Sequence, residues 1–242
     1  MDRSDPRYHA YVQILKEELI PAMGCTEPIA LAYAGAVARR TLGELPDRVT
    51  VQASGSIIKN VKSVIVPNTD HLKGIDAAVS AGIVAGDPDK KLEVIASVTP
   101  EQIQAMKQFM DEVPIEIEHI DKGCTFDIVV IVHHKDEYAK VRIANYHTNI
   151  VLIEKNGEIL EQAKVSGDSE DGLTDRNLLD MEHIWDFAMT VEIDEVKALL
   201  DQQISCNMTI ADEGLKNDYG ANIGKVLLAM DGDNVRVKAK AM

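Results

Sequence analysis

Apolar residues recur at helical spacing at both ends of the chain and alternate with polar residues in its middle. The apolar positions between residues 11 and 20 repeat with a helical period. Pro21 and Gly24 then interrupt the pattern, and a second helix is predicted over residues 29–40. This second segment is rich in alanine and glycine, so other backbone can approach it closely. We expect it to be buried.

From residue 48 onward the character changes to β-branched and alternating. Strands are predicted at residues 49–53, 92–97, 115–120, 126–134, 138–146 and 150–160. Helices are predicted between them at residues 57–65, 71–85 and 101–112. The last strand segment contains Asn156-Gly157, the strongest short signal for a β-hairpin. The middle of the chain therefore predicts an α+β unit with a mixed or antiparallel sheet.

Beyond this unit, residues 162–172 are polar, acidic and rich in turn formers, which is typical of a linker. Helical spacing then returns up to the end of the chain. We expect an α+β fold in which residues 1–46 and 173–242 form one helical domain. Residues 47–162 are expected to form an α+β domain inserted into it.

Charge and composition narrow the possible partners. The chain has 242 residues, 45% of them hydrophobic, with 40 acidic and 25 basic side chains and a net charge of −15. Such a balance opposes binding to nucleic acid and to anionic membrane surfaces. The N-terminus lacks a signal-peptide pattern, and the longest apolar run, residues 29–38, is too short to span a bilayer. We expect a cytoplasmic protein, with homo-oligomerisation left open.

The position of Cys25 suggests a reactive or metal-binding cysteine. The three cysteines, Cys25, Cys124 and Cys206, form neither a disulfide framework nor a zinc pattern. Thr26 can cap the helix that contains Pro28 in its first turn, so Cys25 precedes a helix N-terminus that favours a thiolate. The alternative is a small buried hydrophobe in a helix corner. Cys124 and Cys206 are interpreted as structural.

Several motifs resemble the L-cysteine desulfidase family, also called serine dehydratase-like proteins, which are similar to iron–sulfur L-serine dehydratases. The resemblance begins with the segment from Glu18 to Ala30. It continues through Ser54-Gly-Ser-Ile-Ile-Lys-Asn60, Val66-Pro-Asn-Thr69, Gly86-Asp-Pro-Asp-Lys-Lys91, His147-Thr-Asn-Ile150 and Tyr219-Gly-Ala-Asn-Ile-Gly-Lys225. It implies a [4Fe–4S] cluster with Cys25 as one ligand. The family's other cluster cysteines would follow residues 235–242, so the resemblance implies that this chain alone holds no complete cluster.

The resemblance also implies a reaction, α,β-elimination from L-cysteine or L-serine. Pyruvate and ammonia would be the products, with sulfide released from cysteine. Thr26 and Glu27 would orient the substrate ammonium or the cluster, while Asn60, Asn68 and His147 are the other expected substrate contacts. The sequence supplies no candidate for the general base. The alternative function is a non-catalytic fragment or split subunit that binds a small amino acid and regulates or scaffolds a partner.

Overall fold

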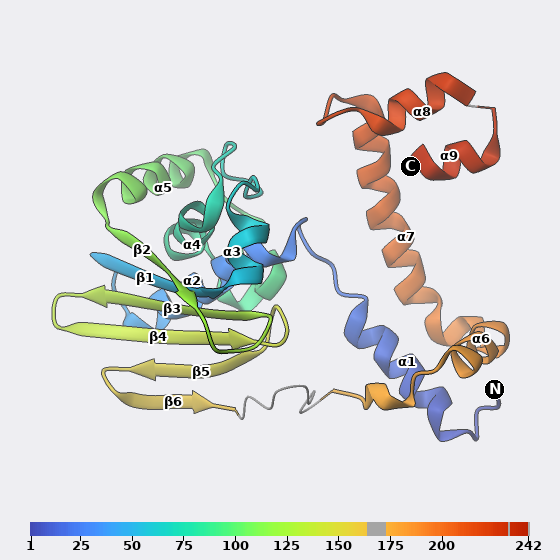
Figure 1. Ribbon diagram of the computed structural model, residues 1–242, viewed down its shortest axis with the longest axis horizontal. Helices are drawn as coiled ribbons and strands as arrows, with labels where there is room; N and C mark the ends of the chain where they lie inside the picture. The colour runs from blue at the N-terminus through green and yellow to red at the C-terminus, as the bar shows by residue number, and fades with distance from the viewer. Residues whose placement is uncertain (164–172, 232, 242) are drawn as a thin grey trace. The chain divides into compact units, whose positions relative to one another are not determined.

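Two compact units make up the protein. The computed structural model describes residues 1–163, 173–231 and 233–241. Unit 1 comprises Met1–Pro21 and Gly172–Met242, and unit 2 comprises Ala22–Asp171. The expected α+β fold, with helices at both chain ends and a sheet between them, is confirmed (Figure 1). The first boundary lies after Pro21 and not at residue 46, because helix α2 (Thr26–Leu42) packs against the sheet of unit 2.

Unit 2 is built on a six-stranded mixed sheet with the order β2-β1-β3-β4-β5-β6. Its strands are β1 (Arg48–Ser54), β2 (Ile115–Ile120), β3 (Asp127–His134), β4 (Glu137–Ala144), β5 (Ile150–Lys155) and β6 (Glu158–Gln162). β1 and β2 are parallel, and every other neighbouring pair is antiparallel. The predicted hairpin joins β5 to β6, where Asn156 and Gly157 have φ values of 51° and 85°. Both central residues therefore adopt the positive φ of a type I′ turn.

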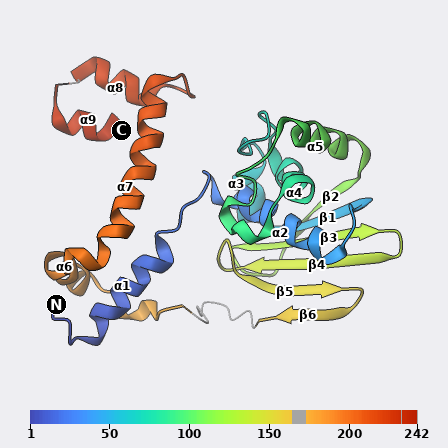
Figure 2. The same ribbon diagram turned by 180° about the vertical axis from the view of Figure 1, so that it is seen from behind.

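The helices of unit 2 cover one side of this sheet (Figures 1 and 2). They are α2, α3 (Gly55–Val61), α4 (Gly74–Ala85), the 3₁₀ segment η1 (Pro88–Glu93) and α5 (Pro100–Glu112). Two local predictions are wrong. Residues 92–97 form no strand: residues 92–93 end η1, which packs against α2, and residues 94–97 form turns. The helix predicted over residues 57–65 ends at Val61, and Ile65 instead pairs with Lys73 in an isolated bridge.

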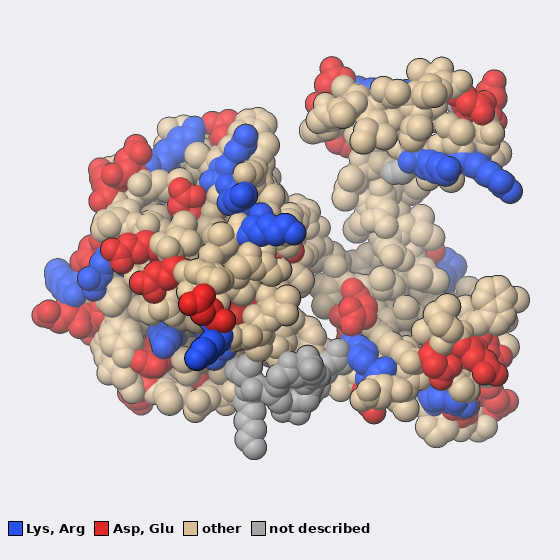
Figure 3. Space-filling view, in the orientation of Figure 1, with Lys and Arg blue, Asp and Glu red and all other residues tan. Residues whose placement is uncertain are grey.

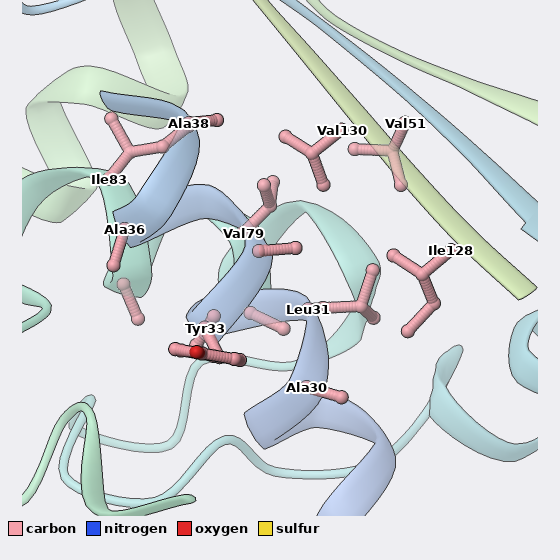
Figure 4. Close-up of a cluster of buried hydrophobic side chains, with 14 of the residues drawn as sticks. Ala30, Leu31, Tyr33, Ala36, Ala38, Val51, Val79, Ile83, Ile128 and Val130 are labelled. Atoms are coloured by element: carbon pink, nitrogen blue, oxygen red, sulfur yellow. The ribbon is translucent and has the colours of Figure 1, made fainter. Parts of the chain in front are cut away.

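The core of unit 2 depends on a close approach of α2 and α4. Gly82 of α4 lies so near α2 that a Cβ atom there would be 1.8 Å from the carbonyl oxygen of Ala32. Beside this contact, apolar side chains from the two helices meet those of β1 and β3 (Figure 4). They include Leu31, Val79, Val51 and Ile128, each fully buried. The expectation that residues 29–40 are largely buried is thus confirmed for every position up to Ala38.

Unit 1 is helical. It contains α1 (Pro6–Glu18), η2 (Arg176–Leu178), α6 (Met181–Thr190), α7 (Ile193–Lys216), α8 (Ile223–Asp231) and α9 (Val235–Ala241). Its core is small and is formed by Tyr8, Tyr11, Val12, Ile14, Phe187 and Val196. Arg176 adds ion pairs to Glu17 at 2.5 Å and to Glu18 at 2.7 Å. The two ends of the chain therefore pack together through both apolar and charged contacts.

The predicted linker over residues 162–172 lies, from residue 164 onward, outside the described residues. Within the described part of the chain, no helix combines the length and the apolar character that crossing a bilayer requires.

Candidate functional site

Five of the six residues expected at the site meet in unit 2, and we call them the Glu27 cluster. They are Cys25, Thr26, Glu27, Asn60 and His147. The first three stand at the beginning of α2, Asn60 lies near the end of α3, and His147 lies between β4 and β5. The fold thus brings together three segments that are far apart in the sequence.

Glu27 is the centre of the hydrogen bonding in this cluster. The Cys25 thiol donates to Oε2 of Glu27 at 3.1 Å, and the Asn60 side-chain amide donates to Oε1 at 3.2 Å. Gly24, with φ of +126°, makes the turn that leads into α2. Cys25 then takes the extended conformation of an N-cap residue. Glu27 consequently falls in the first helical turn, where a negative charge is favoured.

The environment of Cys25 favours the thiol. Partial burial raises the pKa of Cys25, and the hydrogen bond to Glu27 and the charge of that carboxylate raise it further. The backbone N–H of Glu27 opposes this effect and lowers the pKa, but by less. The expectation of a thiolate at the helix N-terminus is therefore corrected. Partial burial, together with the ionised carboxylate in contact with the sulfur, outweighs the backbone N–H at the helix N-terminus.

Glu27 itself is held in the ionised form. Burial acts to raise its pKa, but hydrogen bonds from Cys25, from its own backbone N–H and from Asn60 outweigh burial. The neighbouring His147 also contributes, and the net effect is a lowered pKa of Glu27. The cluster thus presents a carboxylate that keeps its negative charge at neutral pH.

His147 forms the second half of the cluster. Its Nε2 lies 2.8 Å from Oγ1 of Thr26, and its ring makes an edge contact with Phe126 at 4.5 Å between centroids. Burial lowers the pKa of His147, while the charge of Glu27 partly opposes that shift. The imidazole is therefore neutral at neutral pH and can accept a proton. Thr26 was expected to be the N-cap residue, but it is the first residue of α2 and its hydroxyl bonds His147 instead.

His147 is also the candidate general base that the sequence did not supply. It is separated from Thr26 by 121 positions, so no local spacing relates the two residues. Its inclusion among the expected contacts depended on the His-Thr-Asn-Ile run alone.

Asn68 lies apart from the hydrogen bonds of the cluster. Its side-chain amide donates to the carbonyl oxygen of Ile95 at 3.1 Å, and its own φ is 57°. The neighbouring Pro67 does approach the cluster, because its Cγ would lie 3.8 Å from a Cβ atom placed on Gly24. Asn68 therefore shapes a loop beside the cluster, and a direct substrate contact from it stays a prediction.

The described residues do not fit a complete iron–sulfur cluster. Among them, no group of three or more His, Cys, Asp and Glu side chains is arranged to hold a metal. Cys124 is half-buried in unit 2, and Cys206 lies in unit 1, where it is exposed. Exposure of Cys206 is a correction to its interpretation as a structural, buried cysteine. Ligation of a [4Fe–4S] cluster by Cys25 stays an untested prediction.

Chemically, the cluster offers three different groups within reach of one another. Glu27 provides a fixed anion that can accept hydrogen bonds from an ammonium group. His147 provides a neutral base, and Cys25 provides an exposed thiol. These groups suit a small ligand that carries a positive charge and a transferable proton.

In comparison with known proteins, the chain is similar to proteins named UPF0597. No protein-family model matches it. UPF0597 protein DSY1109 of Desulfitobacterium hafniense is 53% identical over 245 residues, which cover 100% of this chain and 56% of that protein. UPF0597 proteins of Lachnoclostridium phytofermentans and Treponema denticola are 43% and 40% identical, covering 97% and 100% of this chain. The chain spans 56% of the length of each of these three relatives.

These relatives correct the resemblance drawn from the motifs. Relatives that are 37% to 53% identical over nearly the whole chain are named UPF0597 proteins, without a cysteine desulfidase or serine dehydratase name. The motifs at residues 18–30 and 147–150 are therefore not evidence for the desulfidase family.

Proposed function

We propose that unit 2 binds a small amino acid at the Glu27 cluster. The observation that carries this proposal is the convergence of Glu27, Asn60 and His147 from three separate segments. Titratable groups with shifted pKa values that converge from separate segments are candidates for a ligand site. The acidic centre matches the ammonium group that every free amino acid carries at neutral pH.

Binding of the ammonium group would replace contacts that exist within the cluster. Both carboxylate oxygens of Glu27 already accept hydrogen bonds, one from Cys25 and one from Asn60. An ammonium group has three donors and a full positive charge, so it is a stronger partner for a carboxylate than a thiol is. Cys25 would then be released to face the side chain of the ligand.

The reaction that we propose for this site is α,β-elimination from L-cysteine or L-serine. His147 would take the proton from Cα, and the electron pair left behind would form the Cα–Cβ double bond. The Cβ–S or Cβ–O bond would break, and the heteroatom would leave with that bond's electrons and gain a proton as sulfide or water. The resulting enamine would become an imine, which water hydrolyses to pyruvate and ammonia. A neutral imidazole is the form that this first proton transfer requires.

A second candidate is a regulatory module that binds the amino acid without converting it. The coverage of the relatives favours it, because this chain spans 56% of their length and other parts of a longer protein could hold further catalytic groups. Amino-acid binding at Glu27 is common to both candidates. Only the elimination reaction needs His147 as a base.

Binding is tested by calorimetric titration of the 242-residue chain with L-serine and with L-cysteine under anaerobic conditions. Glu27→Gln should weaken binding about tenfold or more, because a charge-assisted hydrogen bond contributes about 1.5–3 kcal/mol. The matched control is Glu44→Gln, which removes the same charge from an exposed position outside the cluster. Equal affinity of Glu27→Gln and the unchanged chain would refute the proposed site.

Catalysis is tested separately by pyruvate formation from the same two amino acids. His147→Gln should keep binding but lose pyruvate release, since the amide can hydrogen-bond Thr26 but cannot take up the α-proton. Binding without pyruvate release by the unchanged chain would favour the regulatory module. Pyruvate release by His147→Gln at the rate of the unchanged chain would remove His147 from the mechanism.

A further inference from the structure

One side of helix α7 in unit 1 carries large apolar side chains that are exposed. Ile193, Leu200, Ile204 and Met208 are 70%, 37%, 57% and 42% exposed. They are spaced by seven, four and four residues, so they lie along one face of the helix. We call these four residues the α7 stripe.

The rest of unit 1 gives α7 little support. Val196 is the single residue of α7 that is buried, and it lies near the start of this 24-residue helix. Helices of this kind normally gain most of their stability from packing an apolar face against another element. Among the described residues of α8 and α9, none is itself buried. Most of the α7 stripe therefore lacks a second element packed against it, although an apolar helix face normally packs against one.

Between Asp201 and Asp212, α7 has no charged side chain. Over the middle of α7, the visible surface is largely free of Lys, Arg, Asp and Glu (Figure 3). Isolated exposed hydrophobic residues are common on proteins, but an extended apolar row on a helix marks a contact site. Neighbouring α6 adds Met181, Trp185 and Met189 at four-residue spacing, which are 81%, 70% and 67% exposed.

The length of the relatives indicates what covers this face. Three UPF0597 proteins match this chain over 97% to 100% of its residues, yet the match takes up only 56% of each of them. Each relative therefore contains a large polypeptide with no counterpart in these 242 residues. We propose that the α7 stripe is the docking surface for this additional polypeptide.

The chemistry of the stripe defines the element that would dock. A straight apolar row on a helix is covered best by the apolar row of a second helix. On one flank of the stripe, α7 carries Asp194, Asp201 and Asp212, while Lys197, which lies among the stripe residues, pairs with Asp201. Lysine or arginine side chains flanking the apolar row of the partner helix would therefore complement α7.

The first test is co-expression of the 242-residue chain with the part of UPF0597 protein DSY1109 that lies outside the match. The two polypeptides should co-elute as a one-to-one complex in size-exclusion chromatography with light scattering. Ile204→Glu combined with Met208→Glu should abolish the complex, because two charges would be buried without partners. Gln202→Glu combined with Ser205→Glu adds the same charge to the same helix away from the stripe and should leave the complex intact.

A single-chain fusion of the two polypeptides, in the order found in the relative, provides a second measurement that does not depend on their separate solubility. Hydrogen peroxide should oxidise Met208 several-fold more slowly in the fusion than in the 242-residue chain. Buried Met106 is the reference that reacts slowly in both proteins.

Three results would overturn the proposal. The first is equal oxidation of Met208 in the fusion and in the 242-residue chain. The second is protection of Met208 in the 242-residue chain alone, which would mean that this chain covers its own stripe. The third is a dimer of the 242-residue chain that the Ile204→Glu and Met208→Glu changes dissociate, which would make a second copy the occupant.

Discussion

The thiol of Cys25 donates a hydrogen bond to the carboxylate of Glu27, with 3.1 Å between Sγ and Oε2, although Cys25 is the N-cap residue of α2. A helix N-terminus alone would lower the pKa of this cysteine. Partial burial acts in the opposite direction, and the hydrogen bond to Glu27 and the charge of its carboxylate add to it, so the pKa is raised. The reactivity of Cys25 is therefore controlled by whether Glu27 keeps its charge and its position.

Replacing Glu27 by glutamine should lower the pKa of Cys25. The substitution removes the negative charge beside the sulfur but leaves the sulfur at the helix N-terminus. Alkylation by iodoacetamide, followed peptide by peptide in a mass spectrometer as pH is raised, should reach its midpoint at lower pH for Cys25. Exposed Cys206 serves as an internal reference that should not change. A higher midpoint for Cys25 in Glu27→Gln would contradict this account.

Shortening Phe126 should raise the pKa of His147. Burial is the main cause of the lowered pKa, and the Phe126 ring lies against the imidazole at 4.5 Å between centroids. Phe126→Ala would admit water to the imidazole ring. Water would stabilise the protonated form of His147 and move its pKa back toward that of an exposed histidine. An NMR titration of the imidazole Hε1 signal measures the shift. An unchanged midpoint would mean that other neighbours exclude water from His147.

The ion pair of Asp127 and Arg142 should couple strongly in a double-mutant cycle. Asp127 is fully buried, and Arg142 contacts both of its carboxylate oxygens, at 2.9 and 2.7 Å. Arg142→Met leaves a buried carboxylate without its partner and should lower the free energy of unfolding by about 3 kcal/mol. Asp127→Asn combined with Arg142→Met should cost less than the sum of the two single changes. Additive losses in urea denaturation would show that the two side chains act independently.

Two glycine-to-alanine substitutions should have opposite effects. A Cβ atom at Gly82 would lie 1.8 Å from the Ala32 carbonyl oxygen, so Gly82→Ala must separate α2 from α4 and should destabilise unit 2 by about 3 kcal/mol or more. Gly214 in α7 has no heavy atom within 4 Å of such a Cβ atom. Gly214→Ala should therefore stabilise that helix by about 0.5–1 kcal/mol. Thermal unfolding followed by circular dichroism compares the stabilities of the two variants. A Gly82→Ala variant as stable as the unchanged chain would contradict the close packing of α2 and α4.

Unit 1 should lose stability in acid through Glu17. Burial acts to raise the pKa of Glu17, but hydrogen bonds from Arg176 and Thr174 outweigh it and lower the pKa below its ordinary value of 4.5. Because the folded pKa is the lower one, this stabilisation is fully present above pH 4.5 and is lost as pH falls through the folded pKa. Fluorescence of Trp185, the single tryptophan, follows the urea unfolding of unit 1. Glu17→Gln should flatten this acid dependence, and a slope equal to that of the unchanged chain would assign it to other carboxylates.

Local patterns were the reliable part of the sequence. The Asn156-Gly157 turn is such a case, because its signal lies in adjacent residues. Thr99 and Gln102, three positions apart, likewise form a capping box at the start of α5. By contrast, Leu92, Val94 and Ile95 are buried in a 3₁₀ segment and the turns that follow it, and burial alone does not distinguish a strand from an irregular segment.

Tertiary contacts explain what the sequence could not provide. The sequence did indicate Cys25, Thr26 and Glu27, since they are adjacent at the start of a helix. The contact of Thr26 with His147 depends on how the connection between β4 and β5 folds over α2, and no spacing encodes it. The raised pKa of Cys25 likewise depends on the rotamer of Glu27, which local pattern does not fix.

Unit 1 is formed by two segments that are far apart in the sequence, so its parts are synthesised at different times. α1 emerges before unit 2, with Tyr8, Tyr11, Val12 and Ile14 on its apolar side, whereas their partners Phe187 and Val196 lie beyond all of unit 2. Translation at about 5–20 residues per second means that α1 waits roughly 8–35 s for α6 and α7. Unit 2 is continuous and can complete its core during that interval. A nascent chain therefore exposes an amphipathic helix next to a folded domain, which is a substrate for chaperones that bind short apolar segments.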